Sequence, residues 1–238
     1  MTLIFTVRCD KLASASMDYS ARLWDVETGK MFREWNLESG ARCVSLSCGD
    51  KQLAVLTDPW GDQSSMIHIF DVSSDKLISK IAMPSASRTN RALWGPLNKS
   101  IITCNESGSL MSWDPNTKQC TIERNDHNLA IPDFTFHQKD QMTLITASTD
   151  MSATVCSRLC HWVISKFTLS LVLRQLYDTV TLEPLKSYKT DRPVNSAAIS
   201  PLMDHVRFLA ACEACAFPSP DHEAIYRWRW VAASLRTR

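Results

Sequence analysis

The chain has 238 residues, of which 45% are hydrophobic and 21% are charged, and its formal net charge is +1. This balance is typical of a globular protein with a buried core and excludes a disordered or membrane-embedded chain. Because 26 lysines and arginines face 25 aspartates and glutamates, the charge gives no support to a direct nucleic-acid interface, which normally needs a basic excess.

The cysteines and the most apolar segment indicate a cellular compartment. The nine cysteines are an odd number, and no secretory signal precedes them, so we expect reduced thiols in a cytoplasmic protein. The longest apolar stretch, from Trp162 to Leu173, contains Lys166 and is shorter than the roughly 20 apolar residues of a membrane-spanning helix. We therefore expect no transmembrane segment.

In chain order, the sequence predicts repeated groups of short strands. Residues 1–10 are an atypical extension, and a repeat region covers 11–206. Alternating apolar residues lead to an aromatic-aspartate pair, and a turn usually rich in Thr, Ser, Asn, Asp or Gly follows each pair. The pairs are Trp24-Asp25, Phe70-Asp71, Trp113-Asp114 and Tyr177-Asp178. A strand-turn-strand unit at this period is typical of the blades of a WD40 β-propeller, so we predict an all-β fold.

The spacing of the pairs reveals an interruption in the last group. From Asp25, the successive steps to Asp71, Asp114 and Asp178 are 46, 43 and 64 residues. The segment 155–175 lacks the strand alternation of its surroundings, and without these 21 residues the last step becomes 43. Its removal also places Asp150 six residues before Tyr177, as Asp18 stands six residues before Trp24. We therefore interpret 155–175 as a non-repeat insert, and we hypothesise that it is a retained intron or a gene-model error.

The strands around the pairs fill about four blades. The second and third blades are complete, and their strands are predicted at 41–48, 51–58, 66–72 and 76–83, and at 88–95, 100–106, 109–114 and 119–124. The first blade starts partway, with its first strand at Lys11. The fourth runs through 131–138, 142–148 and 185–190, and 193–200 begins a fifth. The tail 207–238 shows no blade pattern, and we expect it to be disordered.

Two groups of polar residues are candidates for a site. Asp18 with Ser14 or Ser16 resembles part of a Ser, His, Asp set, but the spacing favours a structural network instead. In such a network a turn aspartate, a strand hydroxyl, a histidine from the preceding loop and the aromatic of the pair tie one blade together by buried hydrogen bonds. The same set in the fourth blade would be His127, Asp150, Tyr177 and either Ser148 or Thr146.

No catalytic or cofactor motif is present, so we predict a protein that is not an enzyme and binds no cofactor. Cys212 and Cys215 form a CxxC pair, to which Cys156, Cys160 and His161 could be joined as a zinc site. An isolated CxxC is weak evidence, and we predict no metal site. The Trp and Arg cluster of the tail could stack on single-stranded RNA, but the lack of any blade pattern there favours an out-of-register extension after Val206.

The repeat region resembles one family, eukaryotic translation initiation factor 3 subunit I, also described in animals as a receptor-interacting WD-repeat protein. The resemblance rests on 12–30, 92–108 and 144–154, and above all on 188–206. It implies a seven-bladed propeller, of which this chain would hold about four blades.

The resemblance also implies a function. If the resemblance holds for function, the protein would be a non-catalytic scaffold subunit of the initiation factor 3 complex that supports preinitiation complex assembly. Its direct partners would be subunits B and G and, through them, the small ribosomal subunit. Two alternatives remain: a signalling adaptor that binds a serine/threonine kinase receptor, and a propeller-based hydrolase, which would need acidic or histidine residues at a channel mouth.

Overall fold

The computed structural model describes residues 2–6, 10–84, 87–136, 143–150, 152–155, 177–178, 182–184, 186–189, 193–199, 207–212, 215–217, 225–227 and 230–234. Within these ranges the chain forms strands and one short 3-10 helix, η1 (Pro96–Asn98), which confirms the predicted all-β class. In the same ranges, no helix has the length and apolar character that crossing a membrane requires. The chain divides into two compact units, Met1–Arg124 and Asn125–Arg238.

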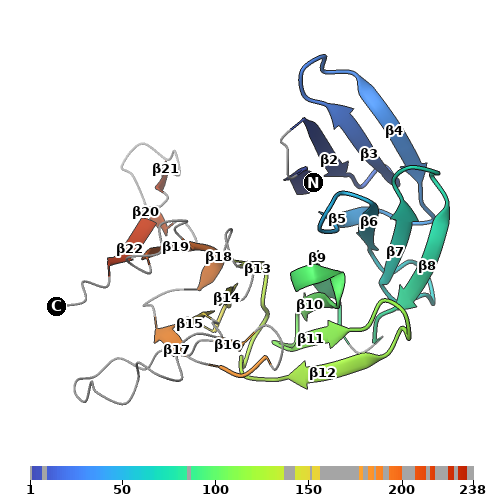
Figure 1. The fold of residues 1–238 in the computed structure, drawn as a ribbon. Helices are drawn as coiled ribbons and strands as arrows, with labels where there is room; N and C mark the ends of the chain where they lie inside the picture. Colours follow the sequence, from blue (N-terminus) through green and yellow to red (C-terminus); the bar gives the residue numbers. More distant parts are fainter. Residues whose placement is uncertain are drawn as a thin grey trace. The chain divides into compact units, whose positions relative to one another are not determined.

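The first unit contains four-stranded antiparallel sheets in which the strands follow chain order (Figure 1). This up-and-down meander is the arrangement of a propeller blade. The first blade is β1 (Thr2–Phe5), β2 (Lys11–Ala15), β3 (Ser20–Asp25) and β4 (Met31–Asn36). The second is β5 (Ala41–Leu46), β6 (Gln52–Thr57), β7 (Met66–Asp71) and β8 (Leu77–Ala82). The third is β9 (Thr89–Trp94), β10 (Ile101–Asn105), β11 (Leu110–Trp113) and β12 (Cys120–Arg124).

The first blade has more strands than the sequence predicts. Strand β1 lies within residues 1–10, the predicted atypical extension, and pairs with β2 so that Ile4 stands opposite Ala13. Ile4 also packs against the buried core of the first two blades, and burial of an apolar side chain favours this pairing. The blade therefore has four strands and does not start partway, which corrects the expectation.

The core of the first unit lies between successive blades. One cluster of buried side chains joins the first blade to the second and includes Leu23, Trp35, Leu53 and Phe70. Leu23 and Leu53 are almost wholly inaccessible to solvent, and each such side chain contributes about 2 kcal/mol to stability by leaving water. Strands β6 (QLAVLT) and β10 (IITCN) are buried along almost their whole length, as expected for strands covered on both faces.

The fourth blade, in the second unit, has a third strand made of two separate segments. Its sheet contains β13 (Asp133–Phe136), β14 (Thr143–Ala147), β15 (Ser152–Val155) and β17 (Lys186–Lys189), with β16 (Tyr177–Asp178) paired to β14. Val155 stands opposite Ile145, and the next residue of β14, Leu144, stands opposite Tyr177. Tyr177 therefore takes the position opposite β14 that the residue after Val155 would occupy in an uninterrupted strand.

This register refines the predicted insert. Val155 belongs to β15, whereas the sequence pattern assigned it to the insert 155–175. The pattern did not distinguish Val155 from the apolar residues that follow, but a β-branched residue opposite Ile145 suits a strand. The interruption thus begins one residue later, and the rest of the predicted insert lies outside the described residues.

Strands also occur beyond the predicted end of the repeat region. β18 (Val194–Ile199) pairs with β19 (Arg207–Cys212), which pairs with β22 (Trp230–Ser234), and β20 (Cys215–Phe217) pairs with β21 (Ile225–Arg227). The tail 207–238 was expected to be disordered, so these strands differ from that expectation. Short apolar runs such as RFLAAC and WVAAS can form strands without the aromatic-aspartate mark on which the prediction depended.

Candidate functional site

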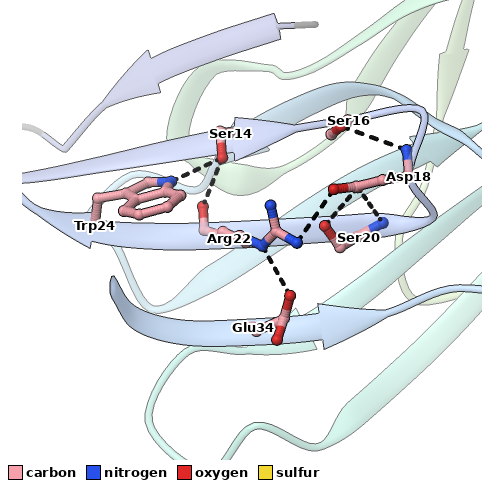
Figure 2. Close-up of polar contacts among 7 residues, drawn as sticks. All are labelled: Ser14, Ser16, Asp18, Ser20, Arg22, Trp24 and Glu34. Carbon is pink, nitrogen blue, oxygen red and sulfur yellow. Dashed lines mark hydrogen bonds and ion pairs between the residues drawn. The ribbon is translucent and has the colours of Figure 1, made fainter. Parts of the chain in front are cut away.

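The polar residues of the first blade form two groups that meet at Arg22, whose backbone carbonyl accepts the hydroxyl of Ser14 at 3.5 Å (Figure 2). In one group, the indole N–H of Trp24 donates to Ser14 Oγ over 2.9 Å. In the other, Asp18 accepts the backbone N–H of Ser20 at 3.1 Å and its hydroxyl at 2.6 Å. Asp18 bonds within its own turn instead of to the hydroxyl that meets the tryptophan. The expected Asp, Ser, Trp chain is therefore divided.

Arg22 lies beside the turn and links it to the outer strand. Its guanidinium contacts Asp18 at 3.1 Å and Glu34 at 2.7 Å, so it bridges β3 and β4 (Figure 2). The hydrogen bond from the Ser20 hydroxyl is the main reason that the pKa of Asp18 lies below its ordinary value, and burial of the carboxylate opposes this lowering. Arg22 adds to the lowering, so Asp18 carries a negative charge at neutral pH.

The fourth blade contains a more continuous version of the same network. His127 Nδ1 lies 3.0 Å from Asp150 Oδ2, and His127 Nε2 lies 2.8 Å from Thr146 Oγ1. Of the two expected hydroxyls, it is thus Thr146 that meets the histidine, while Ser148 donates to the carbonyl of Ala130 at 3.1 Å. The histidine is buried, so these contacts satisfy a polar ring inside the blade.

The aromatic residues of the pairs differ in what they can bond. In the third blade the indole N–H of Trp113 donates to Thr103 Oγ1 at 3.0 Å, which repeats the bond of the first blade. Phe70 of the second blade has no such donor and instead packs against Trp35, with ring centroids 5.8 Å apart. The side chain of Tyr177 lies outside the described part of the chain. Its backbone nevertheless holds the same register as Trp24, opposite a leucine of the second strand.

The aspartates of the pairs stabilise the turns that follow them. Asp25 accepts the backbone N–H of Thr28 at 2.7 Å, and Asp114 accepts that of Asn116 at 2.8 Å. The hydroxyl of Ser73 is the main cause that lowers the pKa of Asp71 to about 2, because it donates to the ionised carboxylate. A carboxylate bonded to the backbone two or three residues on is a turn-forming group. The side chain of Asp178 lies outside the described residues.

An ion-pair group that the sequence did not predict lies between the second and third blades. Asp58 directly follows β6 and is contacted by Arg42 of β5 at 2.6 Å and by Arg88, just before β9, at 2.8 Å. Burial is the largest single influence on Asp58 and raises its pKa, but the hydrogen bonds from both arginines outweigh it and the pKa is lowered. The two arginines are one blade period apart in the sequence, which is the signal that could have revealed them.

A cleft of about 370 Å³ also lies in the first unit. Apolar and charged residues both line it, including Leu23, Leu46, Val72, Asp10, Lys11 and Asp50. No group of three His, Cys, Asp or Glu residues in the described part of the chain is arranged to hold a metal ion. Cys156, Cys160 and His161 lie outside that part, as do the side chains of Cys212 and Cys215.

Comparison with known proteins adds relatives by sequence. No protein-family model matches the chain. The chain is 34% identical over 194 residues to a protein of Nematostella vectensis named eukaryotic translation initiation factor 3 subunit I, covering 81% of this chain and 54% of that protein. It is 36% identical over 203 residues to the protein of that name from Drosophila willistoni, covering 82% and 56%. The chain therefore spans about half the length of the curated relatives it matches.

Comparison with solved structures adds a likeness in fold. A chain in the crystal structure of the mitotic checkpoint complex is similar with a TM-score of 0.67, at 14% sequence identity, over 89% of this chain and 56% of that one. At this identity the likeness shows the fold alone, and that fold is a WD40-like propeller. The predicted fold class agrees with it.

Proposed function

This chain is a relative of eukaryotic translation initiation factor 3 subunit I, and from that relationship we propose that it is a non-catalytic WD-repeat scaffold in translation initiation. The observation that carries the proposal is sequence identity of 34% to 36% over about four fifths of the chain. The blades supply rigid sheets whose turns face solvent, and loops held on such a scaffold commonly carry binding.

The polar groups of the blades support a structural role. In the first and third blades each tryptophan N–H is bonded to a strand hydroxyl, and in the fourth the histidine bonds an aspartate and a threonine. A nucleophile in an acyl-transfer enzyme would need an open position beside it for the substrate. The Thr146 hydroxyl is instead wholly buried against the histidine, so its contacts suit stability rather than catalysis.

The partners follow from the family. We propose that the protein acts in the cytoplasm within the initiation factor 3 complex, where it contacts subunits B and G, and through them the small ribosomal subunit, during preinitiation complex assembly. The balanced charge supports protein contacts over a direct RNA contact.

Affinity purification tests this proposal. The tagged full chain is expected to recover initiation factor 3 subunits from a cell extract. A matched variant lacking 156–176, which joins Val155 to Tyr177 in the observed register, is expected to recover more of them because its fourth blade has a continuous third strand. Recovery of a serine/threonine kinase receptor without initiation factor subunits by both chains would contradict the proposal and favour the signalling adaptor.

A further inference from the structure

Three large apolar side chains lie exposed in neighbouring turns of the first two blades. Met17 and Tyr19 belong to the turn between β2 and β3, and Trp60 belongs to the loop between β6 and β7. Their exposed fractions are 57%, 44% and 63%. The rings of Tyr19 and Trp60 meet edge to face, with centroids 6.2 Å apart. We call these three residues the aromatic platform.

The backbone holds the aromatic platform in one geometry. Trp60 and Gln63 exchange two backbone hydrogen bonds of 3.1 and 3.0 Å, which closes a two-residue hairpin in which Gly61 has a φ of +57°. Tyr19 has a φ of +67°, which is uncommon for a bulky residue, and its carbonyl accepts the N–H of Leu37 at 2.8 Å. A rigid exposed aromatic loses little conformational freedom when it binds, and aromatic residues of this kind often dominate binding energy.

The charges beside the aromatic platform indicate the chemistry of its partner. Asp18 lies between Met17 and Tyr19 in the turn, and its carboxylate is almost half exposed but already paired with Arg22 at 3.1 Å. Asp62 lies at the tip of the Trp60 hairpin, and its side chain is exposed. An exposed tryptophan face attracts a cation, and a neighbouring carboxylate strengthens that attraction.

We propose that the aromatic platform docks a segment of a partner protein that presents an arginine or lysine beside an apolar side chain. The apolar side chain contacts Met17 and Tyr19, and the cation lies over Trp60 within reach of Asp62. The exposed carboxylate of Asp62 repels phosphates, which favours a protein segment over RNA. This inference does not depend on the proposed function, because it rests on the exposed surface alone.

Selection from a random 12-residue peptide library on the immobilised full chain tests the inference. The enriched peptides are expected to pair Arg or Lys with an adjacent apolar residue. Trp60→Ala is expected to weaken their binding at least about tenfold, and Trp60→Phe by less, because a phenyl face still holds a cation. Asp62→Asn is expected to weaken binding about threefold and to reduce its dependence on salt.

The matched control is Phe32→Ala, which removes another exposed aromatic, 51% exposed, from the outer strand β4 and is expected to leave peptide binding unchanged. Thermal melting of each variant checks that the exposed substitutions leave the fold intact. Enriched peptides that bind Trp60→Ala as tightly as the parent chain, or that carry acidic residues instead, would overturn the inference. Binding of a labelled oligouridine that depends on Trp60 would overturn it in favour of RNA.

Discussion

Replacement of Asp58 by alanine is expected to destabilise the first unit strongly. The carboxylate is only 8% exposed and accepts hydrogen bonds from Arg42 at 2.6 and 3.3 Å and from Arg88 at 3.2 and 2.8 Å. Breaking a buried ion pair costs about 3 to 5 kcal/mol, but the arginines are 27% and 38% exposed, so water screens part of the interaction. We therefore expect a loss of about 3 kcal/mol in the free energy of unfolding.

Urea denaturation followed by tryptophan fluorescence measures this loss. Asp62→Ala is the matched control, because it removes an exposed aspartate from the adjoining loop and is expected to change stability by less than about 0.5 kcal/mol. The pKa of Asp58 is lowered in the fold, so its contribution is present above the ordinary carboxylate pKa and is lost as pH falls through the folded value. A parent-like midpoint for Asp58→Ala at pH 7 would refute the reasoning that the two arginines and Asp58 tie the blades together.

Three further predictions concern single groups. Trp24→Phe removes the bond to Ser14 and is expected to cost about 1 kcal/mol of unfolding free energy, whereas the same change made in a Ser14→Ala background should cost less. Burial lowers the pKa of His68 to about 4, and Lys80 adds to this lowering. The unfolded chain therefore binds more protons than the folded chain, and the free energy of unfolding is expected to fall as the pH falls from about 6.5 to 4. His68→Gln should flatten that fall in urea titrations. Deletion of 156–176 is expected to raise the melting temperature by a few degrees, and an unchanged or lower value in calorimetry would contradict the split-strand interpretation.

The sequence predicted the repeated strands well because their signals are local. Alternating apolar residues and the aromatic-aspartate pairs gave the second and third blades close to their observed bounds, and the pair spacing located the interruption near Val155. Strand β1 has no such mark, since its pairing with β2 depends on contacts made only in the fold. The strands β19 and β22 were not predicted for the same reason.

The candidate site was predicted only in part. The spacing placed His127 with Asp150, and the two are in contact, but it could not choose between Thr146 and Ser148. Thr146 lies within β14, whereas Ser148 follows the strand and bonds the carbonyl of Ala130, and this difference is visible only in the fold. Spacing also placed Asp18 near Ser14, yet the nearer Ser20 hydroxyl competes for the same carboxylate. The aromatic platform and the group around Asp58 each bring together residues of two successive blades, and no single repeat encodes such a contact.

The divided third strand of the fourth blade has a consequence for the order of assembly. To place Tyr177 opposite Leu144 the chain must close a loop of about 20 residues, at an entropic cost of roughly 3 kcal/mol. Strand β16 has only two residues, and each of its backbone hydrogen bonds to β14 contributes about 1 kcal/mol to stability. We therefore expect β16 to join the sheet after β14 and β15 have paired, and to detach while they stay together. Its amide protons should exchange with solvent far faster than those of β14.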